Sequence, residues 1–305
     1  MEFRDRLWVL GRRLLGRRGT FLLRNFLAEL NFIFGSYEDP RSRPFGVSAM
    51  VCTYNEEDWV VEVLLSAKEL VDEYVVVDSS TDRTPELVMK LRDEGLNIRL
   101  YRIPPGDLAA AKGLAIKEAK YRWILQLDAD FIFYDWAPKY LRKYIEGLDE
   151  RKHYLIYWPW ILICGDLKHV CSERPYHIEH WLFTNSGKLI YKNIMINNNA
   201  RDHLIAPLKL YKVNYIKRSL GLHLAGVRKR LSRLAMKSLW NFNIDDIKEL
   251  SRKGLNPEDI VKIKAKEVYG TEDLEEVGRR LINEMIKSLP QYDGEYPSVL
   301  MKYLT

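Results

Sequence analysis

The triplet Asp128-Ala129-Asp130 follows directly on the apolar run Trp123 to Leu127, which has the composition of a buried strand. Two carboxylates two residues apart at a strand end can reach one divalent cation. Mg²⁺ and Mn²⁺ both take oxygen ligands and leave positions for substrate phosphates. A cation held there would neutralise charge on a departing diphosphate. Acidic pairs are also common in solvated loops, so the motif indicates a metal site mainly because it directly follows a predicted strand.

A second polar cluster, Thr53 to Glu57 (TYNEE), follows the apolar run Val47 to Cys52. Backbone and hydroxyl groups at a strand end, followed by a helix N-terminus, suit an anionic ligand, and the Tyr54 ring can stack on a base. The alternative is a helix-capping turn, with Asn55 as the N-cap and the two glutamates in the first turn. Both interpretations can hold together.

A third cluster, Asp78 to Asp82, ends the apolar run that begins at Tyr74. An acid that closes a strand can accept hydrogen bonds from a nucleobase or a ribose. The alternative is a polar loop in which Thr84 caps the next helix. The patterns G-x-G-x-x-G and G-x-x-x-x-G-K-[ST] are both missing from the sequence, which disfavours a dinucleotide-binding dehydrogenase and a P-loop NTPase.

The elements that must hold these clusters alternate along the chain from residue 45. The patterning predicts strands over 47–52, 74–78, 97–101, 123–127 and 154–163, and helices over 57–70, 84–93, 108–120 and 138–145. Buried strands that alternate with helices predict an α/β fold with a doubly wound, mostly parallel sheet. Ligands of such sheets bind beyond the carboxyl ends of the strands, where the three clusters fall.

Composition narrows the class of protein. The 305 residues are 47% hydrophobic and 30% charged, which excludes a disordered or collagen-like chain, and the net charge of +6 favours an anionic partner. The odd number of cysteines, three, indicates no disulfide framework and a reducing compartment. The longest apolar run, Tyr154 to Cys164, is too short to span a bilayer, and no signal peptide is evident. We therefore expect a cytoplasmic protein, either soluble or peripheral on the inner face of the membrane.

Four stretches together resemble the nucleotide-sugar-binding half of glycosyltransferase family 2, whose members have the GT-A fold. They are VSAMVCTYNEE, YVVVDSSTDRT, AAAKGLAIKEAK and RWILQLDADF, in the family's order over roughly residues 46–135. The resemblance implies an inverting, metal-dependent transferase of the hexosyltransferase type. Its donor would be a UDP- or GDP-linked sugar.

The resemblance also implies roles for individual residues. The nucleoside would be lined by Thr53, Tyr54, Asn55 and Glu56, and Asp78 would bind the base. Lys112 stands where the family often has an Arg near the diphosphate, although Gly113 replaces the usual Asn. In the acidic motif, Asp128 and Ala129 would lie on the ribose side, and Asp130, with Asp128, would hold Mn²⁺ or Mg²⁺.

The acceptor half offers two candidates for the carboxylate that deprotonates the acceptor hydroxyl. Asp202 follows the stretch Lys188 to Lys192, which is similar to a segment of a bacterial-type subgroup of the family, and is the favoured base. Glu179 is the alternative. The same subgroup has a later His, and His223 stands in that place, near the metal or diphosphate. Each of these residues can equally be a salt-bridge partner or a satisfied loop residue.

The rest of the chain suggests partners and boundaries. Residues 1–45 and a helix predicted over 227–240 are basic and amphipathic, so each can lie on an anionic membrane or pack on the protein itself. We expect a basic extension (1–45), a catalytic domain (46–225, with donor half 46–135 and acceptor half 136–225) and a helical extension (226–305). The acceptor would be a glycan or a lipid-linked sugar of cell-surface polysaccharide or glycoconjugate synthesis. No nucleic-acid-binding motif is present.

Competing interpretations have weaker support. The group Cys164, His169, Cys171, His177 and His180 lacks the spacing of a zinc site. A sugar nucleotidyltransferase would place a Gly-rich phosphate loop after the first strand. A catalytically degenerate peripheral-membrane or scaffold protein would not be expected to keep the acidic motif intact.

Overall fold

The computed structural model describes residues 38–171, 176–196, 199–205, 211–224, 226–239 and 257–304, with single positions at Gly16, Gly19, Leu22, Leu23, Phe26, Leu30 and Gly254. For residues 176–181 and most of 194–205 it describes the backbone alone. The chain divides into two compact units: residues 1–159 with 178–220, and residues 160–177 with 221–305. Most of the basic segment 1–45 lies outside the described residues, and the predicted three-part division stays a prediction.

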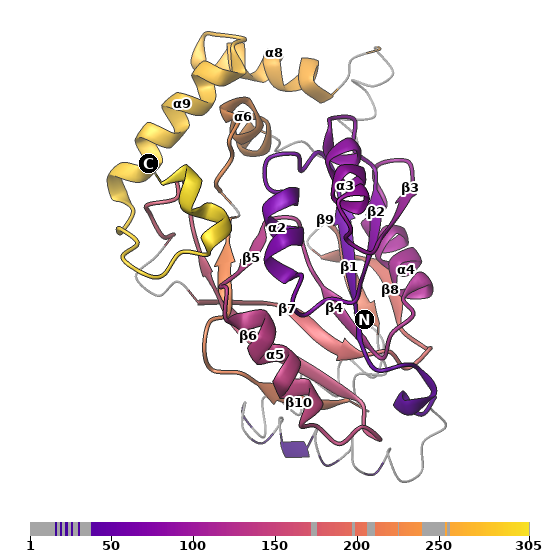
Figure 1. The fold of residues 1–305 in the computed structure, drawn as a ribbon. Helices are drawn as coiled ribbons and strands as arrows, with labels where there is room; N and C mark the ends of the chain where they lie inside the picture. Colours follow the sequence, from indigo (N-terminus) through magenta and orange to yellow (C-terminus); the bar gives the residue numbers. More distant parts are fainter. Residues whose placement is uncertain are drawn as a thin grey trace. The chain divides into compact units, whose positions relative to one another are not determined.

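A mixed, mostly parallel sheet forms the centre of the first unit (Figure 1). Its parallel part has the order β3 (Ile98–Arg102), β2 (Glu73–Asp78), β1 (Val47–Thr53), β4 (Trp123–Gln126). Next to β4 lies the antiparallel β7 (Tyr176–Thr184), followed by β6 (Tyr154–Leu162), which pairs in parallel with β10 (Lys212–Tyr215). The predicted doubly wound, mostly parallel sheet is therefore confirmed.

Strand burial explains the central part of this sheet. Every residue of β2 is buried, as is all of β1 except Cys52, because helices cover the sheet. The helices of the first unit are α2 (Val60–Ala67), α3 (Thr84–Asp93), α4 (Leu108–Glu118) and α5 (Ala137–Glu146), with a short 3₁₀ turn η1 (Pro40–Ser42) and the strand β5 (Phe131–Phe133). Apolar runs of this kind have no polar face to expose, which is why the sequence predicted them well.

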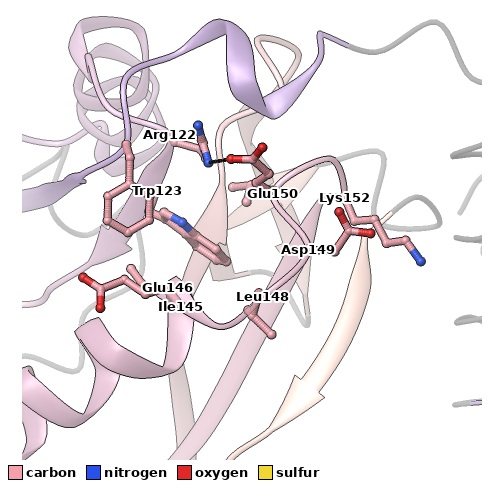
Figure 2. Close-up of a pocket in the computed structure, with 10 residues that line it drawn as sticks. Arg122, Trp123, Ile145, Glu146, Leu148, Asp149, Glu150 and Lys152 are labelled. Atoms are coloured by element: carbon pink, nitrogen blue, oxygen red, sulfur yellow. Dashed lines mark ion pairs between the residues drawn. The ribbon is translucent and has the colours of Figure 1, made fainter.

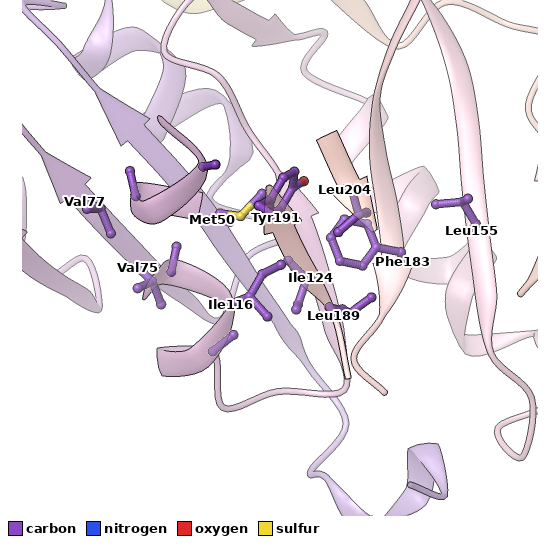
Figure 3. Close-up of a cluster of buried hydrophobic side chains, with 14 of the residues drawn as sticks. Met50, Val75, Val77, Ile116, Ile124, Leu155, Phe183, Leu189, Tyr191 and Leu204 are labelled. Atoms are coloured by element: carbon purple, nitrogen blue, oxygen red, sulfur yellow. The ribbon is translucent and has the colours of Figure 1, made fainter. Parts of the chain in front are cut away.

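A hairpin that the sequence did not predict completes the first unit. Strands β8 (Ile190–Ile196) and β9 (Asn199–Ile205) form a separate antiparallel sheet in which Asn193 pairs with Asp202. Its buried side chains Leu189, Tyr191 and Leu204 join the core formed by α4 and the central sheet (Figure 3). Small residues on α4, among them Ala111 and Ala115, let the helix approach closely.

The second unit is mainly helical. Strand β11 (Gly221–His223) pairs with the last part of β6, and the helices are α6 (Leu231–Leu239), α8 (Pro257–Tyr269) and α9 (Leu274–Met285), with 3₁₀ turns η3 (Ile286–Ser288) and η4 (Ser298–Tyr303). Glu258 and Asp259 lie in the first turn of α8, where negative charge stabilises a helix. Buried side chains of α6, Ala235 and Leu239, pack with residues of α8 and α9. This favours the packing interpretation of the basic helix.

One prediction about the cysteines is wrong. Cys164 and Cys171 form a disulfide, with a Cα–Cα distance of 5.2 Å. A bridge pairing Ile163 with Val170 brings the two cysteines together, and such a local pairing is compatible with an odd total. The indication of a reducing compartment, which rested on that odd count, loses its basis. Within the described residues, no helix combines the length and the apolar character needed to cross a bilayer.

Candidate active site

The three polar clusters meet at one edge of the sheet. Strands β2, β1 and β4 are neighbours and parallel, so Asp78, Thr53 and the Asp128 turn follow strands that end on the same side. The register sets Thr53 opposite Asp78, and the amide of Leu127 extends the ladder by donating to the Met50 carbonyl at 3.0 Å. This is the edge at which ligands of doubly wound sheets bind.

The Asp78 carboxylate is the centre of a buried hydrogen-bond network. Its Oδ1 accepts from Thr53 Oγ1 at 2.5 Å and from Ser80 Oγ at 2.6 Å. Its Oδ2 accepts from the Ser80 amide at 3.2 Å and pairs with Arg102 Nη1 at 2.7 Å. Asp78 is 0% exposed and Thr53 is 3% exposed. Sequence reasoning named Asp78 and Thr53, included Ser80 in the third cluster without a role of its own, and missed Arg102.

Asn55 joins the first two clusters rather than capping a helix. Its φ of 56° is left-handed, a conformation that Asn tolerates better than most residues, and its Oδ1 accepts from the amides of Thr81 at 2.7 Å and Asp82 at 3.2 Å. Helix α2 begins only at Val60, so the predicted N-cap role of Asn55 is wrong.

Thr84 ties the same two loops together. It is the first residue of α3, not its cap, and its Oγ1 accepts from the Glu56 amide at 2.9 Å. The neighbouring Glu57 carboxylate accepts from the Arg83 amide at 2.9 Å. Tyr54, between these contacts, is 47% exposed, so its ring is accessible for stacking.

The acidic motif forms a turn after β4. The Phe131 amide donates to the Asp128 carbonyl at 3.1 Å, Ala129 is buried, and Asp128 and Asp130 are half-buried. Among the residues that the structure describes, no group of three or more His, Cys, Asp or Glu side chains could hold a metal ion.

Lys112 lies at the junction of α4 and the hairpin. It is buried, and its Nζ is 5.3 Å from the centre of the Tyr191 ring. The Tyr191 hydroxyl in turn donates to Gln126 Oε1 at 2.5 Å, at the end of β4. Tyr191 and Gln126 were not predicted, because only the folded hairpin brings residue 191 to residue 126.

A second contact fixes the hairpin to the start of α4. Asn193 Nδ2 donates to Oδ1 of Asp107, the N-cap of α4, at 2.9 Å. Hydrogen bonds from the Ala110 amide and from Asn193 hold the pKa of Asp107 below its usual value. The cap is therefore a stable anion at neutral pH.

The acceptor-half candidates are placed by backbone register. Asp202 in β9 pairs with Asn193, which is bound to the start of α4. Glu179 lies in β7, the strand that pairs antiparallel with β4, three residues before Leu182, which faces Leu125. The side chains of Glu179 and Asp202 are not among those described. His223 lies in β11 of the second unit. All three roles stay predictions.

A surface cavity of about 420 Å³ lies away from these clusters (Figure 2). It opens at the amino end of the sheet, beside Trp123, the first residue of β4, and is lined by Phe45 and by charged residues. Arg122 Nη1 and Glu150 Oε2 form an ion pair there at 3.6 Å. Its position opposite the strand carboxyl ends separates it from the candidate active site.

Comparisons with known proteins agree with this placement. Residues 48–170, which contain all three polar clusters, match the family Glycosyl transferase family 2. The chain is similar to the poly-beta-1,6-N-acetyl-D-glucosamine synthases of Staphylococcus aureus strains MSSA476 and COL, each 31% identical over 100 residues. These matches cover 32% of this chain and 24% of the relatives, about a quarter of their length.

Solved structures with a similar arrangement include TarS 1-349 of S. aureus, with 15% identity and a TM-score of 0.43 over 81% of each chain. The complex of TarS 1-349 with UDP-GlcNAc gives 15% identity and a TM-score of 0.39, over 79% of this chain and 72% of that one.

Proposed function

We propose that this chain, whose residues 48–170 match Glycosyl transferase family 2, is a metal-dependent, inverting glycosyltransferase with the GT-A fold. It moves a sugar from a UDP- or GDP-linked donor to an acceptor hydroxyl. The observation that carries the proposal is the buried bond between Thr53 and Asp78, which joins two strand ends of the matched segment beside the acidic motif.

In this proposal the donor nucleoside lies against the first two clusters. Tyr54, whose ring is exposed, stacks on the base, and Asp78 accepts a hydrogen bond from it. Thr53, Asn55 and Glu56 line the nucleoside. The support is that all five residues lie in one hydrogen-bonded pair of loops.

The carboxylates of Asp128 and Asp130 fit Mn²⁺ or Mg²⁺. Two half-buried carboxylates on one turn leave the remaining coordination positions to water and diphosphate oxygens, which is the habit of these hard cations. The bound ion supplies positive charge to the diphosphate. Lys112 adds a second positive charge from α4, and His223 is proposed to lie near the same group.

The acceptor hydroxyl needs a base, and Asp202 is our first choice. The pairing of Asp202 with Asn193 supports it, because Asn193 is bound to the helix that carries Lys112. Glu179 is the alternative, on the strand beside β4. We expect Asp202→Asn to lower transfer at least about a hundredfold with nucleotide affinity unchanged, while Glu179→Gln leaves transfer within a few-fold of the native rate. The reverse result assigns the base to Glu179.

The proposed acceptor is a glycan or a lipid-linked sugar in the synthesis of cell-surface polysaccharide or glycoconjugate. A membrane contact would suit such an acceptor, and the basic segment 1–45 is our candidate for it. Flotation of the protein with vesicles of anionic and of neutral phospholipid tests this contact. Equal recovery with both kinds of vesicle would contradict it.

Calorimetric titration tests the donor site directly. The protein is titrated with UDP and with GDP, each with and without Mn²⁺, alongside Asp130→Asn and the control Asp93→Asn, an exposed residue of α3. We expect binding of one nucleotide that depends on Mn²⁺, is lost in Asp130→Asn and persists in Asp93→Asn. No binding of either nucleotide would overturn the proposal, and binding that Mn²⁺ does not change would remove its metal dependence.

A further inference from the structure

Arg102 is the last residue of β3, one strand farther from the acidic motif than Asp78. Its Nη1 pairs with Asp78 Oδ2 at 2.7 Å, and its Nη2 donates to the Ser80 carbonyl at 2.7 Å. The Arg102 side chain is 51% exposed, whereas the Asp78 carboxylate is fully buried. An ion pair with one buried and one exposed partner borders the nucleoside site at this point.

The Asp78 carboxylate has no acceptor position to spare. A carboxylate offers about four lone-pair positions. Three hydrogen bonds, from Thr53 Oγ1, Ser80 Oγ and the Ser80 amide, and the ion pair with Arg102 Nη1 occupy them. A nucleobase N–H that binds Asp78 must therefore displace one of these donors.

Burial decides which donor can leave. Thr53 is 3% exposed and Ser80 is 2% exposed, so water cannot replace Asp78 as the hydrogen-bond partner of either hydroxyl. A buried polar group without a partner is strongly destabilising. The Ser80 hydroxyl also accepts from the Asn55 amide at 2.7 Å, which holds it in place. The guanidinium of Arg102 is half-exposed, so water hydrates it when its ion pair with Asp78 breaks.

We infer that Arg102 occupies the lone-pair position on Asp78 that the base of the nucleotide sugar needs. Nucleotide binding then replaces the guanidinium with an N–H of the base. The inference rests on the proposed function, in which Asp78 binds the base. Arg102 is then a positioning residue: it gives the buried carboxylate a partner while the site is empty. The exchange admits bases with an N–H donor on the bound edge, as uracil and guanine have.

A matched control lies on the same strand. Arg99 of β3 pairs with Glu73 of β2 at 2.8 Å, but at the amino end of the sheet. The Arg99 side chain is only 25% exposed, and it donates also to Tyr101 Oη at 3.1 Å. Arg99→Met therefore removes the same kind of ion pair without touching the nucleoside site.

The test compares nucleotide affinity in the native protein, Arg102→Met and Arg99→Met by calorimetry with UDP and GDP at pH 8. We expect Arg102→Met to bind the preferred nucleotide about two- to fivefold more tightly, which is the equilibrium cost of breaking a half-exposed ion pair. The matching nucleoside, uridine or guanosine, should show the same ratio, because the exchange takes place at the base. Arg99→Met should leave the affinity unchanged.

Equal or weaker binding by a folded Arg102→Met would overturn the exchange and leave the proposed function standing. Tighter binding of the nucleotide without tighter binding of the nucleoside would also overturn it, since the effect would then lie at the diphosphate. If Arg102→Met does not fold, Arg102→Lys keeps a positive charge but loses the two-pronged contact, and it should bind more tightly than the native protein. Absence of binding by every protein would instead overturn the proposed donor site.

Discussion

The two ends of strand β2 carry the same arrangement of side chains. At each end a hydroxyl from β1 and an arginine from β3 bind a buried carboxylate of β2. At the amino end Ser48 Oγ donates to Glu73 Oε1 at 2.6 Å, and Arg99 pairs with Oε2. At the carboxyl end Thr53 and Arg102 do the same for Asp78. A buried acid with its own arginine is therefore not by itself the mark of a binding site.

What differs is the surroundings of each arginine. At the amino end the Lys120 amide also donates to Glu73 Oε1 at 2.7 Å, and Arg99 contacts both the carboxylate and the carbonyl of Glu118. At the carboxyl end half of Arg102 faces solvent beside two polar loops. The amino-end group is closed by further protein contacts, and the carboxyl-end group is open to an incoming partner. The two ends therefore carry the same charges and differ in whether an incoming hydrogen-bond donor can replace the arginine.

The largest effect should be common to both ends. Glu73→Ala leaves the partly buried Arg99 without its acid, and Asp78→Ala leaves the buried hydroxyls of Thr53 and Ser80 without their acceptor. We therefore expect each to lower the free energy of unfolding by about 3–5 kcal/mol. Urea denaturation followed by circular dichroism measures this. Asp93→Ala, which breaks an exposed pair with Arg92, serves as the control and should change stability by less than about 1 kcal/mol. A small loss of unfolding free energy at either acid would show that the contacts of that acid contribute little to stability.

Nucleotide affinity should separate the two ends. Asp78→Asn turns one carboxylate oxygen into an N–H donor that faces the base N–H, so we expect the affinity to fall about ten- to a hundredfold, the loss of one charged hydrogen bond. Glu73→Gln should leave it unchanged, because Glu73 lies at the far end of the strand. Titration calorimetry on both variants gives the ratio. A similar loss in Glu73→Gln would mean that the effect reports general loosening of the sheet.

The hydroxyl partners should give a smaller contrast. Ser48 donates to Glu73 and also accepts from the Tyr121 amide at 3.1 Å, so Ser48→Ala loses two contacts and should cost about 2 kcal/mol of stability. Thr53→Val keeps the side-chain volume and loses the bond to Asp78, for about 1 kcal/mol. Equilibrium unfolding in urea compares them. The reverse order would mean that the carboxyl end depends more on its hydroxyl than the amino end does.

The sequence predicted the strands that carry the two buried acids but not the side-chain contacts between those strands. The apolar runs that became β1, β2 and β4 could be predicted because strands buried between helices carry almost continuous apolar sequence. The positions of Thr53 and Asp78 followed from the parallel order. Arg102 could not be singled out, because only the register of β3 against β2 sets it opposite Asp78.

The failures have the same physical origin. Asn55 looked like a helix cap, but its left-handed backbone turns it toward the Thr81 loop, 26 residues on. The contact between Lys112 and Tyr191 depends on a hairpin whose strands are only partly apolar. The disulfide between Cys164 and Cys171 depends on one local bridge. Contacts that arise from long-range register or from a single backbone conformation leave little trace in local patterning.

The smallest expected effect concerns pH and the amino end alone. His153 lies just before β6, where its ring nitrogens contact Thr184 Oγ1 at 2.9 Å and the Glu38 carbonyl at 3.0 Å. Burial lowers the pKa of His153 from its ordinary 6.5, so the folded protein favours the neutral ring. The unfolded chain therefore binds more protons as the pH falls below 6.5, and this part of the stability is complete above that pH and is lost as the pH falls toward the folded value. Urea unfolding at pH 7.5 and 5.5 should show the loss, and His153→Gln should reduce it. Because His153 is at the amino end, nucleotide affinity per folded molecule should not follow this titration, and an affinity that did would couple the two ends of the sheet.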